Sequence, residues 1–180
     1  MKADVLKELP PKTENVYRIE LEEEQRKLYL AAVVDAREKL QAAKPEDKMA
    51  VFAVLMRLRE ICCDPRLIAD NWEGGSAKLD ACAELVSSAV EGGHRILLFS
   101  QFTSMLELLA KRLDAEGISH FTLQGSTPKP VRAELVRRFN GGEVSVFLIS
   151  LRAGGTGLNL TAADIVIHYD PCWNCLLYTS

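Results

Sequence analysis

The sequence predicts an α/β domain with a mainly parallel sheet, preceded by a helical segment. From Ser76 onward, helical patterns alternate with short apolar runs that are joined by short links, which is typical of a parallel sheet covered by helices. The run from Val144 to Ile149 indicates a strand that is buried on both faces. We therefore assign the helical segment and its connector to residues 1–75 and the α/β domain to residues 76–174.

The helical segment is expected to contain one short strand and two helices. Residues 15–21 follow a proline-containing connector and predict the strand, with mixed patterning. A charged helix follows from Leu21 to Gln41, and a break at Lys44-Pro45 separates it from a second helix, about Glu46 to Cys63. The pair Gly74-Gly75 then predicts a hinge before the α/β domain.

Each of the two helices carries a stripe at helical spacing. In the first helix the stripe consists of Gln25, Leu28 and Ala32. In the second it consists of Val51, Leu55, Leu58 and Cys62. The second stripe is apolar throughout, so we expect it to be buried against another part of the protein, with Cys62 in the core.

The elements of the α/β domain follow from apolar runs, caps and glycine stops. In chain order, we expect a helix capped by Ser76 and stopped by Gly92-Gly93, a strand Arg95 to Phe99, a helix Thr103 to Ala115, a strand Ser119 to Leu123, a helix Pro130 to Phe139, a strand Val144 to Ile149, and a strand Ile165 to Tyr169.

Three loops should share one edge of the sheet, because ligand-binding loops lie beyond the carboxyl ends of parallel strands. They are Ser100 to Phe102, Gln124 to Thr127, and the glycine-dense Ser150 to Asn159. Hydroxyls, amides and glycine backbone are typical contacts to phosphate oxygens. For the second loop, an equally supported alternative is that Ser126 and Thr127 cap the next helix and Gly125 serves the turn.

Several other kinds of site are excluded by motif. The glycine loop contains neither a Gly-Lys-Ser/Thr phosphate loop nor a dinucleotide fingerprint. No acidic pair follows a strand to hold magnesium for nucleotide hydrolysis. Cys172 and Cys175 have the spacing of a metal or redox pair, but no second Cys or His pair completes a zinc site. The residues alone predict a phosphate-contacting lobe without hydrolytic machinery of its own and without a metal site.

Composition indicates an intracellular protein that does not enter membranes. Apolar residues make up 48% and charged residues 26%, and the five cysteines show no disulfide-framework spacing. No apolar run is long enough to cross a bilayer. The formal net charge of −3 argues against a generally basic nucleic-acid binder. The basic stretch Lys129 to Arg138 is best interpreted as a solvated helix face.

Seven segments in order resemble the motifs of one family, the C-terminal, RecA-like lobe of Swi/Snf-type DNA translocases in helicase superfamily 2. The segments are Asp4 to Glu14, Gln25 to Tyr29, Leu55 to Cys62 with Pro65, Ser76 to Leu79, Ile96 to Phe102, Gln124 to Thr127 with Arg132, and Val146 to Pro171. The resemblance implies a three-layer lobe of an ATP-dependent motor. Such a motor moves along double-stranded DNA, independently of sequence, in the bacterial cytoplasm or in a nucleus.

By the same resemblance, site residues carry over to matching positions. Those expected near the phosphates of a DNA strand are Ser100, Gln101, Thr127, Ser150 and Arg152. Those expected in the loop that links the DNA contact to the nucleotide cleft are Gly154, Gly155, Gly157 and Asn159. ATP and Mg²⁺ would be bound mainly by a first motor lobe, which is missing here.

Departures from the family pattern limit the expected activity. The Walker lysine and acidic box of the first lobe are absent, and so is the arginine-finger motif expected after Trp173-Asn174. We therefore expect a fragment cut at both ends, with residues 175–180 as a non-native tail, that does not hydrolyse ATP alone. The alternative is a stand-alone α/β module that binds a phosphorylated ligand or a protein without catalysis.

Overall fold

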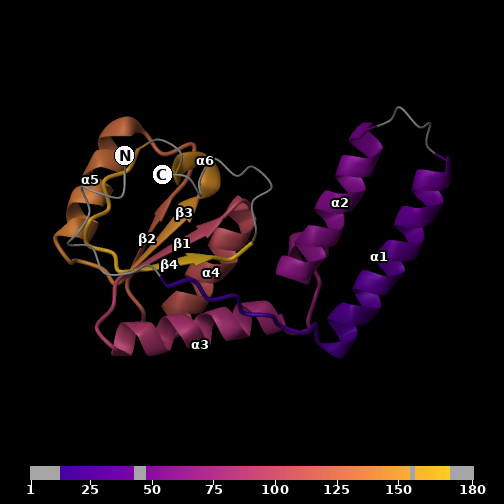
Figure 1. Cartoon of the computed structure of the whole chain (residues 1–180), viewed down its shortest axis with the longest axis horizontal. Coiled ribbons are helices and arrows are strands. Elements are labelled where there is room, and N and C mark those ends of the chain that lie inside the picture. The colour runs from indigo at the N-terminus through magenta and orange to yellow at the C-terminus, as the bar shows by residue number, and fades with distance from the viewer. Residues whose placement is uncertain (1–12, 43–47, 155–156, 171–180) are drawn as a thin grey trace.

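The computed structural model is an α/β lobe with a helical hairpin at one side, and it describes residues 13–42, 48–154 and 157–170 (Figure 1). The four strands are β1 (Ile96–Ser100), β2 (His120–Leu123), β3 (Val146–Ser150) and β4 (Ile165–His168). The helices are α1 (Glu23–Ala42), α2 (Lys48–Cys63), the 3₁₀ turn η1 (Pro65–Leu67), α3 (Ala77–Glu91), α4 (Thr103–Ala115), α5 (Lys129–Asn140) and the short α6 (Leu151–Gly154).

The sheet is parallel throughout, with strand order β2-β3-β1-β4. Strand β3 lies in the interior of the sheet and all five of its residues are buried, as its apolar run predicts. Strands β3 and β1 are the two inner strands. The connection from β1 to β2 therefore passes β3, and the connection from β3 to β4 passes β1. The predicted α/β domain with a mainly parallel sheet is confirmed.

Alternate strand residues face two separate cores, which makes the lobe three-layered. Ile96 and Leu98 of β1 pack with α3 and α4 on one face of the sheet. On the other face, Leu97 packs with Phe147 of β3 and Phe139 of α5. The alternation follows from the two-residue period of a strand, and the helices on both faces remove the apolar side chains from water.

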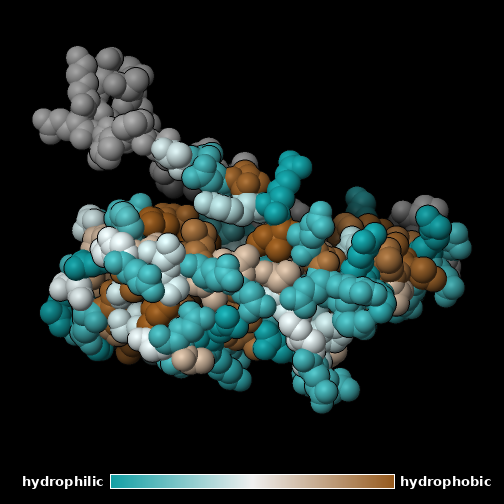
Figure 2. Space-filling view, turned by 90° about the horizontal axis from the view of Figure 1, so that it is seen from below, coloured by the Kyte–Doolittle hydropathy of each residue, from teal (hydrophilic) through white to brown (hydrophobic). Residues whose placement is uncertain are grey.

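The hairpin of α1 and α2 joins the lobe only at one end (Figure 1). Gln25 of α1 is fully buried there, and its Nε2 donates to the Ile61 carbonyl at 2.8 Å. Beyond that end, apolar side chains reach the surface of the hairpin (Figure 2). Those exposed along the two helices are Leu30, Val34, Leu40, Met49, Val51, Phe52 and Leu55.

Three predictions for the helical segment are wrong. Residues 15–21 form no strand, because an extended segment needs a partner strand and none lies beside them among the described residues. The second stripe is not buried, since Val51 is 44% and Leu55 41% exposed. Only the last turn of α2 reaches the lobe, so the core cysteine is Cys63 rather than Cys62.

The end of the basic stretch on α5 is a solvated, ion-paired helix face, as expected, whereas Arg132 is half-buried and its Nη1 donates to the Ala153 carbonyl at 3.5 Å. Arg137 is paired with Glu134, and Arg138 with Glu143. In the part of the chain that the structure describes, no helix has the length and apolar character needed to cross a bilayer.

Candidate nucleic-acid interface

Ser100 and Ser150 lie side by side at the carboxyl edge of the sheet, because they are register partners at the ends of β1 and β3. The loops that follow these two strands therefore start from neighbouring points. Strand β2 pairs with the other side of β3. This pairing brings the start of the second loop, Gln124 to Thr127, to the same edge. The topology thus gathers the three predicted loops at one edge.

Both serine hydroxyls are engaged within the protein. Ser100 is fully buried, and its Oγ donates to Asp170 Oδ1 at 2.6 Å while accepting from the Phe102 amide at 3.2 Å. Ser150 is also buried, and its Oγ accepts from the Ala153 amide at 3.4 Å. The two hydroxyls therefore hold the backbone of the loops in place from inside the protein. The exposed surface of the loops is formed by the residues that follow each serine.

The second loop is closed by its own threonine. Thr127 Oγ1 accepts from the Gln124 amide at 3.1 Å, and the Thr127 amide donates back to the Gln124 carbonyl. The N-cap of α5 is Pro128, with no side-chain cap, so the alternative that Ser126 or Thr127 caps this helix is wrong. Gly125 has open space around its Cβ position and no left-handed φ, so the turn does not require glycine there.

The glycine loop begins as the short helix α6, with the Arg152 side chain exposed. Gly154 lies against the Phe99 ring, where an added Cβ would come within 2.8 Å of Cε1, so a side chain does not fit there. Gly157 has a φ of +66°, in the region that favours glycine. Gly155 lies outside the described residues.

Asn159 lies away from this edge. Its carbonyl accepts from Nδ2 of Asn140 at 2.9 Å, and Asn140 ends α5 on the way back to the start of β3. The same Asn140 side chain accepts from the Ala162 amide. Gly154 thus lies at the carboxyl edge and Asn159 toward the amino edge, so the structure does not bring these two residues together.

Asp170 is the residue of this edge that sequence reasoning missed. It is 1% exposed, directly after β4, and accepts from Ser100 Oγ and from the Gln101 amide, which lies 3.2 Å from each carboxylate oxygen. Arg59 Nη2 of α2 lies 3.7 Å from Oδ2. Burial raises the pKa of Asp170, and the Ser100 and Gln101 hydrogen bonds oppose that rise. Its place after a predicted strand, at the same edge, was the available signal.

Among the residues that the structure describes, those at this edge do not form a set of magnesium ligands. The carboxylate at this edge, Asp170, is occupied by two donors from the protein and by Arg59. Within the described ranges, no three His, Cys, Asp or Glu side chains come together as metal ligands.

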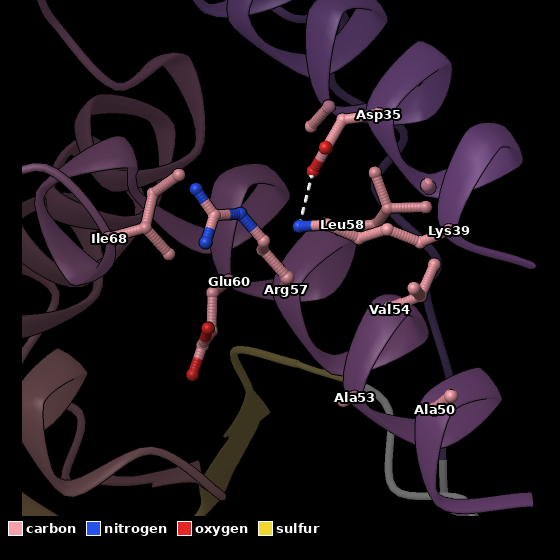
Figure 3. Close-up of a pocket in the computed structure, with 11 residues that line it drawn as sticks. Asp35, Lys39, Ala50, Ala53, Val54, Arg57, Leu58, Glu60 and Ile68 are labelled. Carbon is pink, nitrogen blue, oxygen red and sulfur yellow. Dashed lines mark hydrogen bonds and ion pairs between the residues drawn. The ribbon is translucent and has the colours of Figure 1, made fainter. Parts of the chain in front are cut away.

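A groove of about 430 Å³ lies elsewhere, between α1 and α2 (Figure 3). Alanines of both helices line it, and the Asp35–Lys39 ion pair of 2.8 Å lies at its border. It contains none of the residues predicted for the site.

A three-layer lobe with an all-parallel sheet is the architecture of a RecA-like lobe. Residues 77–179 match the family model of the helicase conserved C-terminal domain, and residues 1–67 match that of the SNF2-related domain. The chain belongs to the helicase C-terminal domain family, and within superfamily 2 it is of the Swi/Snf type.

Curated relatives come from animals and bacteria. The chain is 36% identical over 188 residues to the "SWI/SNF-related matrix-associated actin-dependent regulator of chromatin subfamily A member 1" of Mus musculus, covering 97% of this chain and 18% of that protein. It is 34% identical over 178 residues to an "uncharacterized ATP-dependent helicase" of Mycoplasma genitalium, covering 96% and 17%. The chain thus spans less than a fifth of the length of these relatives.

Solved structures share the fold. The "SWI2/SNF2 ATPase core in complex with dsDNA" of Sulfolobus solfataricus has a TM-score of 0.81 at 26% identity, over 89% of this chain and 35% of that chain. The C-terminal domain of the same ATPase has a TM-score of 0.77 at 27% identity, over 85% and 69%.

Proposed function

We propose that this chain is the second motor lobe of an ATP-dependent translocase that is stimulated by double-stranded DNA. The observation that carries the proposal is the convergence of three loops rich in hydroxyls, amides and glycine at one edge, in a lobe similar to a SWI2/SNF2 core solved with dsDNA. In this proposal the lobe grips the DNA backbone and closes on ATP and Mg²⁺ bound mainly by a first lobe. The proposed translocase acts on duplex DNA in a bacterial cytoplasm or in a nucleus.

The proposed contacts divide by exposure. Arg152 is exposed and supplies a positive charge to a phosphate, while Gln101 and Thr127 are half-buried and supply polar groups. Ser100 and Ser150 lie behind them and hold the two loops in place. Contacts to phosphates carry no base information, so this set of residues supports binding that is independent of sequence.

The glycine segment is proposed to link the DNA contact with the nucleotide cleft. Gly154, Gly155, Gly157 and Asn159 follow the exposed Arg152 directly in the chain. Gly154 is packed tightly on Phe99, whereas Gly157 has backbone geometry that other residues rarely adopt. A segment that is clamped at one point and conformationally permissive at the next suits a loop that changes shape between nucleotide states.

The test compares two arginines. Arg152→Ala is expected to weaken binding of a fluorescent duplex several-fold and to reduce the salt slope of binding by about one, because one phosphate contact is lost. Arg137→Ala is the matched control, since Arg137 is exposed on α5 and paired with Glu134. Equal effects of the two substitutions would contradict the proposed edge.

A second test measures ATP turnover by the pure 180-residue chain. We expect none, with or without duplex DNA, because the sequence holds no Walker lysine and no magnesium carboxylates. DNA-stimulated turnover by this chain alone would contradict the proposal. Failure to bind any duplex would favour the stand-alone module that binds a phosphorylated ligand or a protein.

A further inference from the structure

Asp170 is a buried carboxylate with donors from two separate parts of the chain. A buried charge is unfavourable unless it is paired and hydrogen-bonded, so its partners indicate what it does. Two of them belong to consecutive residues at the end of β1, the hydroxyl of Ser100 and the amide of Gln101. The third is the guanidinium of Arg59 in the last turns of α2.

The loop after β1 depends on this carboxylate for three residues in a row. Asp170 accepts directly from Ser100 and Gln101, and Ser100 Oγ in turn accepts from the Phe102 amide. Phe102 is the N-cap of α4, and its side chain offers no capping hydrogen bond. The start of α4 is therefore connected to Asp170 through a single hydroxyl.

The neighbouring Tyr169 ties the same point to the helical segment. Its hydroxyl donates to the Cys63 carbonyl at 2.8 Å, and the Ser76 hydroxyl donates to that carbonyl at 3.2 Å. Lys78 Nζ lies 4.8 Å from the centre of the Tyr169 ring. The two residues after β4 thus contact the ends of α2 and β1 and the beginning of α3.

We propose that Asp170 is a positioning residue, which fixes residues 100–102 at the carboxyl edge and, through Arg59, connects this loop to the helical hairpin. The inference rests on the proposed function, in which the same loop contacts the DNA backbone. Asp170 does not touch DNA itself, since it is buried beneath the loop.

The chain offers a matched control at the other end of β4. Asp164 precedes β4 as Asp170 follows it, and it accepts from the Arg95 amide before β1 at 2.9 Å and contacts His94 Nδ1 at 2.6 Å. Asp164→Asn and Asp170→Asn therefore make the same chemical change at opposite edges of one strand pair.

The experiment measures duplex affinity, the salt slope of binding and amide hydrogen exchange for the full chain, at a temperature where every variant is folded. Asp170→Asn is expected to reduce affinity about tenfold, as for loss of one hydrogen bond to a charged group, and to lower the salt slope. It should also speed exchange at the amides of Gln101 and Phe102. Asp164→Asn should change none of these. A purely structural role would lower the melting temperature and leave the slope unchanged.

The outcomes separate the two proposals. Unchanged affinity, slope and exchange in Asp170→Asn, or an equal loss in Asp164→Asn, would overturn the positioning role while the proposed function stands. If the wild-type chain binds no duplex, the proposed function fails, and the exchange rates alone decide the role of Asp170. If Asp170→Asn does not fold, Ser100→Ala replaces it, and faster exchange at Phe102 is then the expected result.

Discussion

The lobe and the helical hairpin use apolar residues in opposite ways. In the lobe, Leu148 and its neighbours in β3 are buried on both faces of the sheet. In the hairpin, Leu55 and Phe52 lie on helix α2 with 41% and 49% of their surface exposed. Both β3 and α2 carry several large apolar side chains in sequence. The difference comes from topology, because β3 has a neighbour on every side and α2 has only α1 and one end of the lobe.

The lobe and the hairpin are stabilised by different kinds of contact. Burial of apolar surface stabilises the lobe, whereas at the lobe end of the hairpin Gln25 of α1 is hydrogen-bonded to Ile61 of α2, and Tyr169 of the lobe is hydrogen-bonded to the Cys63 carbonyl. Changes in the lobe should therefore act through packing, and changes in the hairpin through single hydrogen bonds. The predictions below test this difference, beginning with the largest expected effect.

Leu148→Ala should lower the free energy of unfolding by about 3–4 kcal/mol, because it leaves a cavity between fully packed neighbours. The same change at Leu55 should cost less than about 1 kcal/mol, since much of that side chain is already in water. Urea unfolding of both variants measures the difference. Similar losses would show that the exposed stripe of α2 is buried in solution.

Gly154→Ala should destabilise the protein by about 1–3 kcal/mol, because its Cβ would come within 2.8 Å of the Phe99 ring. The matched change Gly125→Ala, at the same edge of the sheet, meets open space and should be close to neutral. Thermal melts of the two variants give the comparison. A neutral Gly154→Ala would mean that Phe99 moves aside easily.

Gln25→Ala should cost about 1–2 kcal/mol, because it leaves the buried Ile61 carbonyl without its donor. Gln41→Ala, at an exposed position near the other end of α1, is the control and should have little effect. Urea unfolding monitored by helical signal measures both. Equal effects would argue that the hydrogen bond between Gln25 and Ile61 does not stabilise the pairing of α1 with α2.

The two carboxylates that flank β4 should respond to pH with opposite signs. Burial raises the pKa of Asp170 above its ordinary 3.8, so its contribution to stability is present below that value and is lost as the pH rises through the raised pKa. The His94 hydrogen bond lowers the pKa of Asp164, so its contribution is present above 3.8 and is lost as the pH falls through the lowered pKa.

Unfolding measured from about pH 3 to about pH 7 tests these signs. Relative to Asp170→Asn, the wild type should lose stability as the pH rises. Relative to Asp164→Asn, it should gain stability as the pH rises, by a small amount because this pair is exposed to solvent. A common sign for both carboxylates would contradict the burial of Asp170.

Much of the lobe could be predicted from sequence because its signals are local. Helix α4 was placed at Thr103 to Ala115 without error, since an apolar stripe is bounded by a polar loop and a glycine. The prediction of a strand over residues 15–21 is wrong, because a strand depends on a partner strand elsewhere in the chain. The prediction that the apolar stripe of α2 is buried is also wrong. A periodic pattern indicates an apolar face of a helix, but not whether another element covers that face.

The three loops of the candidate site could be predicted from the sequence, but the buried Asp170 that hydrogen-bonds to one of them could not. Loops after parallel strands share an edge by topology, so the three loops containing Ser100, Thr127 and Ser150 could be grouped from sequence. Asp170 was missed because its hydrogen-bond partner, Ser100, is 70 residues away in the chain, so no local pattern shows that the two side chains meet. Asn159 followed the glycines in sequence but lies toward the opposite edge, where Asn140 holds its backbone.

In the proposed function, the carboxyl edge of the lobe binds the DNA backbone without reading its sequence. The most direct measurement is the affinity of the chain for two duplexes of equal length and unrelated sequence, over a range of salt concentrations. We expect equal affinities that fall together as salt rises, with log K linear in log salt, because phosphate contacts release counterions. Affinity that stays flat with salt, or that differs more than about tenfold between the two sequences, would contradict it.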